Sequence, residues 1–176
     1  TSVNPDLIYE NIYKWIENKQ IIAIGEIGLE DLTDSEIAIF KKQLDIGEET
    51  KTKVIVHTPR KNKKEVLKVI QDIVPQHIDP KLVVIDHINQ NVAEDVIDKD
   101  YTLGLTVQPQ KMDKEEAIAI LDEYGFDKFL LNSDISNKPS DPLSVPKTVR
   151  ELEKLGYKKT EIEKVAFKNA EKFFKI

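Results

Sequence analysis

The sequence has 176 residues, a length typical of one domain, so we expect residues 1–176 to form a single domain. Hydrophobic residues make up 40% of the chain, enough for a packed core, but no apolar run approaches the ~20 residues of a membrane span, so we expect a cytoplasmic protein with no membrane partner. The formal net charge of −6 argues against a general nucleic-acid coat protein, and the absence of cysteine excludes disulfides and thiolate metal ligands.

Helical and strand-like patterns alternate along the chain. A first helix is predicted over residues 5–18, where apolar side chains recur with helical spacing. Each of five short runs that follow is continuously apolar, as in parallel strands that are buried on both faces. These runs are residues 21–24, 54–56, 82–85, 102–107 and 129–131, with helical periodicity between them and a last helix over 160–174. Helix starts are indicated by Thr33, Asp113 and Thr160, because each precedes a glutamate by three positions.

The residues at the carboxyl ends of the predicted strands distinguish between two possible architectures. Alternation of strands and helices suits an open doubly wound sheet or a (β/α)8 barrel. Four runs end on residues that bind divalent metals: Glu26, His57, His87 and Asp134. In a barrel all carboxyl strand ends converge on one axis, whereas in an open sheet only the strands beside the switch point share a crevice. The pattern therefore favours an α/β fold of the (β/α)8 TIM-barrel type with a divalent-metal site.

Each of these residues also has a simpler interpretation. A histidine is often satisfied within the core or at the surface, Glu26 could cap the following turn, and Asp134 could cap a helix. Asp86 could orient His87 or bind backbone. The third histidine, His77, lies in the polar segment PQHIDP and is interpreted as a surface loop residue.

The strand-end residues and the segments around them resemble the TatD-like metal-dependent hydrolases of the amidohydrolase superfamily, and most closely their archaeal predicted-hydrolase branch. The matching segments are AIGEIGLE, IVHTPR, VVIDHIN, GLTVQP, LLNSD with PSDPL, and NAEKFF. This resemblance implies a fold of eight βα units and, here, one or two Zn, Mn or Mg ions. It implies that Glu26 is the bridging carboxylate of the fourth family strand. It also implies that His57 and His87 are the ligands of the fifth and sixth strands, and that Asp134 is the aspartate of the eighth.

Two departures from the family pattern matter. The sequence lacks the His-x-His pair of the family's opening strand, and its first strand matches the fourth. We therefore expect an incomplete barrel with five parallel strands, family strands 4–8, and flanking helices. We expect the missing N-terminal segment to be supplied as another piece, or the chain to self-associate. The nuclease members also have Glu-Thr-Asp where this chain has Asn132-Ser133-Asp134, which argues against DNA hydrolysis in particular.

The leading hypothesis is a TatD-like nuclease or phosphoesterase, in which a metal-activated water attacks a phosphoester. The resemblance makes Glu26 and Asp134 the catalytic carboxylates, with Asp134 accepting the water proton. The substrate is expected to be a small-molecule phosphoester or a nucleic acid. Arg60 and Lys61 are expected to bind its phosphate. The simpler interpretation of these two residues is the solvent-exposed, lysine-rich start of a helix. The alternatives are an amide, ester or lactone hydrolase and a non-catalytic truncated barrel. Residues expected to orient substrate are Asn89 and Gln108.

Overall fold

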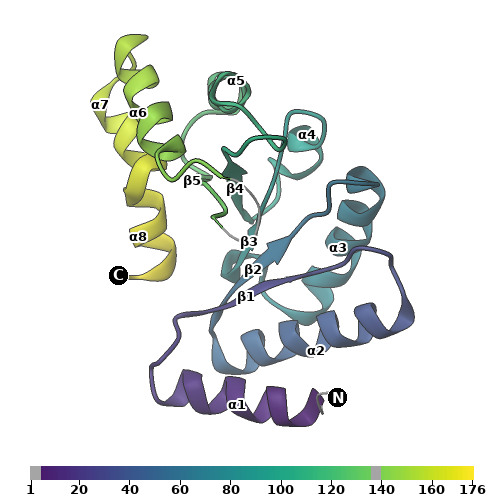
Figure 1. Cartoon of the computed structure of the whole chain (residues 1–176). Helices are drawn as coiled ribbons and strands as arrows, with labels where there is room; N and C mark the ends of the chain where they lie inside the picture. Colours follow the sequence, from purple (N-terminus) through teal and green to yellow (C-terminus); the bar gives the residue numbers. More distant parts are fainter. Residues whose placement is uncertain (1–4, 136–139) are drawn as a thin grey trace. The chain divides into compact units, whose positions relative to one another are not determined.

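The computed structural model describes residues 5–135 and 140–176 of the chain (Figure 1). The chain divides into two compact units, residues 1–84 and 85–176, which are described in turn. Pro139 of the PSDPL segment lies outside the described residues. Within the described residues, no helix is both long enough and apolar enough to cross a membrane.

The first unit alternates helices with two parallel strands. Its elements are α1 (Pro5–Glu17), β1 (Ala23–Gly28), α2 (Asp34–Thr50), β2 (Lys53–His57), α3 (Lys63–His77) and a 3-10 turn at Pro80–Leu82. Strand β3 (Val83–Ile85) spans the division between the units. Helix α2 packs against both strands and against α3, and α1 runs alongside it (Figure 1). The fully buried side chains of α2 include Phe40 and Leu44, as the helical spacing predicts.

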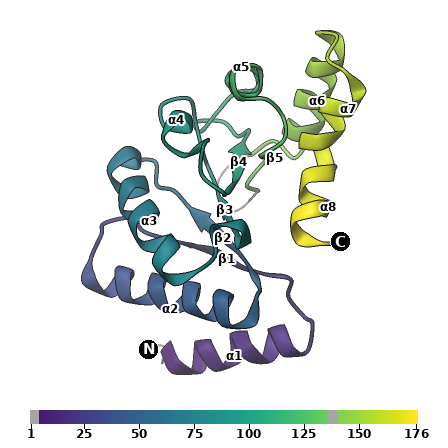
Figure 2. The ribbon, with the colours of Figure 1, turned by 180° about the vertical axis from the view of Figure 1, so that it is seen from behind.

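The second unit repeats the strand–helix pattern and ends in helices. Its elements are α4 (Ala93–Val96), β4 (Thr102–Thr106), α5 (Lys114–Tyr124), β5 (Phe129–Asn132), α6 (Ser144–Lys154), α7 (Lys159–Glu163), a π-helical turn at Lys164–Lys168 and α8 (Asn169–Phe174). Strands β4 and β5 are parallel, with Leu103 opposite Phe129 and Thr106 opposite Asn132. Helix α6 contacts α5, β5 and α7 (Figure 2).

Most of the predicted elements are present, and three local predictions need correction. The first strand lies at residues 23–28 rather than 21–24, because Ile27 is buried and extends the pairing. Thr160 does not cap the last helix, because α7 already begins at Lys159. His77 is not in a loop: α3 continues through Pro75 to His77, whose Nδ1 lies 2.7 Å from Oδ1 of Asp45. The capping contacts of Thr33 and Asp113 are confirmed.

Candidate functional site

Glu26 lies on a bulge within β1, not at the end of that strand. The pairing of β1 with β2 shifts between Ile24 and Ile27, so that Gly25 and Glu26 together face Ile55. A Cβ atom on Gly25 would lie 2.8 Å from Cβ of Ile55, a separation that only glycine avoids. Because a bulge breaks the alternation of side chains, Glu26 is exposed between two buried isoleucines.

His57 is the last residue of β2, as the sequence predicts, and it lies opposite Gly28. A carboxylate oxygen of Glu26 and a ring nitrogen of His57 lie within 4.8 Å of each other. The Nε2 atom of His57 is 2.6 Å from Oε1 of Glu30. Since an ionised carboxylate only accepts hydrogen bonds, this contact places a proton on Nε2 of His57. Holding one ring nitrogen by a carboxylate is the usual support of a metal-ligating histidine.

His87 follows β3 by two residues, and its ring is fixed by a buried relay. Its Nδ1 lies 2.6 Å from Oγ1 of Thr106, and this hydroxyl donates to Oδ1 of Asp86 at 3.3 Å. The hydroxyl therefore accepts from the Nδ1–H group, which leaves the lone pair on Nε2. Oδ1 of Asp86 also accepts hydrogen bonds from the backbone N–H of His87 and from Nδ2 of Asn132, at 2.7 and 2.9 Å. Asp86 thus both orients His87 and binds backbone.

Asp134 follows β5 by two residues, and its side chain converges with that of His87 on one positive charge. Oδ2 of Asp134 forms an ion pair with the ammonium group of Lys111, whose Nζ is 3.2 Å from Nε2 of His87. The backbone at His87 and Asp134 is left-handed, with φ of 61° and 43°. Such strained conformations in non-glycine residues concentrate at functional sites.

The sequence did not single out Lys111. The signal available was its place just beyond β4, the strand for which no metal-binding residue type was found at the carboxyl end. A basic residue there was open to interpretation as an ordinary surface lysine, yet the Lys111 side chain is only 11% exposed.

The four residues expected to contact substrate have different environments. Arg60 and Lys61 are exposed in the segment between β2 and α3. Gln108 is buried, and its Nε2 donates to the backbone oxygen of Asp134 at 2.6 Å, a contact that positions Asp134. The Oδ1 atom of Asn89 is buried and has no hydrogen-bond partner among the described residues. The substrate roles of all four stay predictions.

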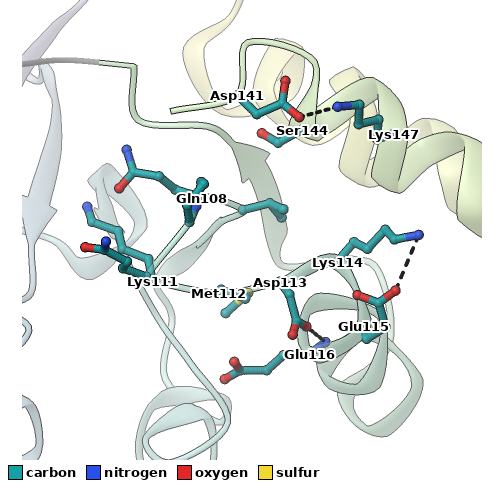
Figure 3. Close-up of a pocket in the computed structure, with 13 residues that line it drawn as sticks. Gln108, Lys111, Met112, Asp113, Lys114, Glu115, Glu116, Asp141, Ser144 and Lys147 are labelled. Atoms are coloured by element: carbon teal, nitrogen blue, oxygen red, sulfur yellow. Dashed lines mark hydrogen bonds and ion pairs between the residues drawn. The ribbon is translucent and has the colours of Figure 1, made fainter. Parts of the chain in front are cut away.

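A pocket of about 490 Å³ opens in the second unit beside Lys111 (Figure 3). Gln108 and Lys111 border it on one side, and Asp141, Ser144 and Lys147 border it on another. The pocket therefore adjoins the residues that hold Asp134.

Comparison with known proteins gives concordant matches along nearly the whole chain. The family model described as TatD related DNase matches residues 2–175. An uncharacterized metal-dependent hydrolase of Methanocaldococcus jannaschii is 36% identical over 98% of this chain and 69% of its own length. The crystal structure of a TatD-like protein from Archaeoglobus fulgidus is 34% identical, with a TM-score of 0.75, and the match covers 96% of this chain and 66% of that one. The chain thus spans roughly two thirds of the length of these relatives.

A more distant solved structure shares the fold. A TatD homologue from Escherichia coli has a TM-score of 0.71 at 18% identity, with 97% of this chain and 71% of that chain covered. Together with the parallel strand pairs, these similarities confirm the expected α/β fold of the TIM-barrel type.

Proposed function

The chain belongs to the TatD-related DNase family, and from this premise we propose that it hydrolyses a phosphoester with the help of a divalent metal ion. The family predicted from the sequence is confirmed, and the expected class, metal-dependent hydrolase, is the one for which the Methanocaldococcus relative is named. The ligands that we assign are Glu26, His57, His87 and Asp134.

The observation that best supports this proposal is the convergence of His87 and Asp134 on the ammonium group of Lys111. Two lone-pair donors, an imidazole nitrogen and a carboxylate oxygen, already hold a positive charge between them. This donor set suits Zn, Mn or Mg. In the first unit, Glu26 and His57 form a second pair of the same composition. The family resemblance assigns all four of these residues as metal ligands.

The residues of this chain have distinct tasks in the proposed reaction. A bound divalent ion would activate water for attack and stabilise the negative charge that develops on the phosphoryl oxygens. Asp134 accepts the proton of the attacking water, and Gln108 holds its backbone in place. The relay through Thr106 and Asp86 keeps the lone pair of His87 on Nε2.

We propose a small-molecule phosphoester rather than DNA as the substrate. The side-chain amide of Asn132 donates to Asp86, at a position where nuclease members of the family carry a glutamate. The chain therefore lacks one carboxylate that those members have. Arg60 and Lys61 are exposed and are proposed to receive the substrate phosphate.

Turnover of phosphomonoester, phosphodiester and carboxylic ester substrates with added Zn or Mn tests the proposed function. Metal-dependent phosphoester hydrolysis is expected in the parent protein and should be abolished by His57→Ala. The matched control is His77→Ala, because His77 pairs with Asp45 and is not an assigned ligand. Full activity of His57→Ala, or activity on carboxylic esters alone, would contradict the proposal.

Self-association and a cytoplasmic location stay predictions. Analytical sedimentation tests the first, and cell fractionation tests the second.

A further inference from the structure

The walls of the pocket beside Lys111 come from two segments of the second unit. Residues 107–116, which lead from β4 into α5, form most of the lining, and Asp141, Ser144 and Lys147 complete it at the start of α6 (Figure 3). A volume of about 490 Å³ falls within the range of small-molecule sites. Because Lys111 lines the pocket and forms an ion pair with Asp134, one side chain separates a ligand in this pocket from the carboxylate that we assign to proton transfer.

The charges around the pocket do not favour an anion. Three lysines line it against four carboxylates. Nζ of Lys147 lies 2.5 Å from Oδ2 of Asp141, and this bond holds the pKa of the Asp141 carboxyl below its usual range. Nζ of Lys114 lies 3.0 Å from Oε2 of Glu151, a bond that raises the pKa of Lys114. The lysines are therefore neutralised by carboxylates, and the pocket offers little attraction to a phosphate.

The uncharged part of the lining suits a polar organic group. Val107 and Met112 are buried apolar side chains that line the pocket. Ser144 also lines it, is 6% exposed, and its Oγ has no hydrogen-bond partner among the described residues. A buried hydroxyl without a partner is costly, so a ligand that supplies a hydrogen bond to it would be favoured.

We propose that this pocket binds the organic group of the substrate, an uncharged alcohol about the size of a nucleoside that offers a hydrogen bond to Ser144. The inference rests on the proposed function and narrows its substrate class. The phosphoryl group would lie towards Asp134, and the alcohol would leave into the pocket. The substrate is then a phosphoester of a neutral, polar alcohol and not a polyanion.

Amide chemical shifts of the metal-free protein, followed during titration with uridine as a neutral probe, test the pocket without any turnover. Binding in the millimolar range or tighter is expected, with the largest shift changes at residues 107–116 and 141–147. Inorganic phosphate should leave those amides unchanged. Ser144→Ala, which removes only the unpartnered hydroxyl, should weaken uridine binding several-fold, up to about tenfold. Ser35→Ala at the start of α2 is the control and should bind uridine normally.

The outcomes separate this inference from the proposed function. If uridine does not bind, if phosphate causes the larger shifts at residues 107–116, or if Ser144→Ala binds uridine unchanged, the pocket assignment is wrong, even when phosphoester turnover is found. If uridine binds and Ser144→Ala weakens it while no phosphoester is hydrolysed, the pocket assignment holds and the proposed reaction fails.

Discussion

The ammonium group of Lys111 forms an ion pair with the carboxylate of Asp134, and both side chains are largely buried, at 11% and 22% exposure. The same nitrogen lies 3.2 Å from Nε2 of His87. A positive charge that belongs to the protein is thus held by two of the assigned metal ligands. A metal ion bound at these atoms must displace the ammonium group, so the two cations compete.

Lys111→Met should therefore tighten metal binding. The substitution keeps the length and apolar stem of the side chain but removes the competing charge. We expect the dissociation constant for Zn or Mn to fall by about tenfold, measured by competition with a chelator. Lys114→Met is the control, because Lys114 lies in the same segment but pairs with Glu151. Unchanged or weaker metal binding by Lys111→Met would show that the ammonium group does not compete.

Thr106→Val should weaken metal binding, so that the dissociation constant for Zn or Mn rises. Valine keeps the β-branched shape on β4 but breaks the relay from Nδ1 of His87 to Asp86. Loss of such a supporting contact typically weakens metal binding about 10–100-fold. Thr102→Val on the same strand is the control and should bind metal like the parent protein. If Thr106→Val binds metal as tightly as the parent, the relay does not support His87.

Gly104 is required by the close approach of β4 to Asp86. A Cβ atom at position 104 would lie 1.9 Å from Oδ1 of Asp86, so the carboxylate or the strand would have to move. We expect Gly104→Ala to lower the free energy of unfolding by about 1–3 kcal/mol, measured by urea denaturation. In an Asp86→Ser background the same substitution should cost less, because the clashing carboxylate is gone. Equal costs in both backgrounds would rule out this clash as the cause.

The start of α2 should make stability depend on pH in the acid range. The backbone N–H of Thr33 donates to the Glu36 carboxylate, and this bond, with those from Asp31 and Glu30, lowers the pKa of Glu36. Because the folded-state pKa lies below the unfolded value, the stabilisation is present above the unfolded pKa and is lost as the pH falls through the folded pKa. Glu36→Gln should therefore lower the melting temperature at pH 7 and have little effect once the carboxyl is protonated.

The control for this pH effect is Glu65→Gln, since Glu65 is the third residue of α3 just as Glu36 is of α2. The melting temperatures of the parent and the two variants are compared at neutral and acid pH. A Glu36→Gln effect that persists undiminished in acid, or that Glu65→Gln reproduces, would mean that the capping carboxylate is not its source.

The sequence was informative about the residues whose position follows from strand order. His57 is the last residue of β2, and His87 and Asp134 lie two residues beyond their strands. Continuous apolar runs locate buried parallel strands, and the residue types that close them are chemically distinctive. The sequence does not predict the bulge at Glu26. Its pattern places the end of the first strand before this residue, whereas the strand pairing continues beyond it.

The contacts that tune the site depend on tertiary structure. The role of Thr106 requires its hydroxyl to meet both His87 and Asp86, across different elements, and nothing in the sequence pattern distinguishes it from another strand threonine. Lys111 likewise acquires its role through Asp134, 23 residues further along the chain. The left-handed backbone conformation at His87 and Asp134 also could not be predicted from the sequence, since neither residue type requires it.

The most direct test of the central claim, that the assigned ligands of this chain hold a divalent metal ion, is the metal content of the protein after loading with Zn or Mn and desalting. The parent protein should retain about one equivalent or more per chain, and the ligand variants His57→Ala and Asp134→Asn should each lose it. A parent protein that retains less than about a tenth of an equivalent, or variants that retain as much metal as the parent, would contradict the assignment.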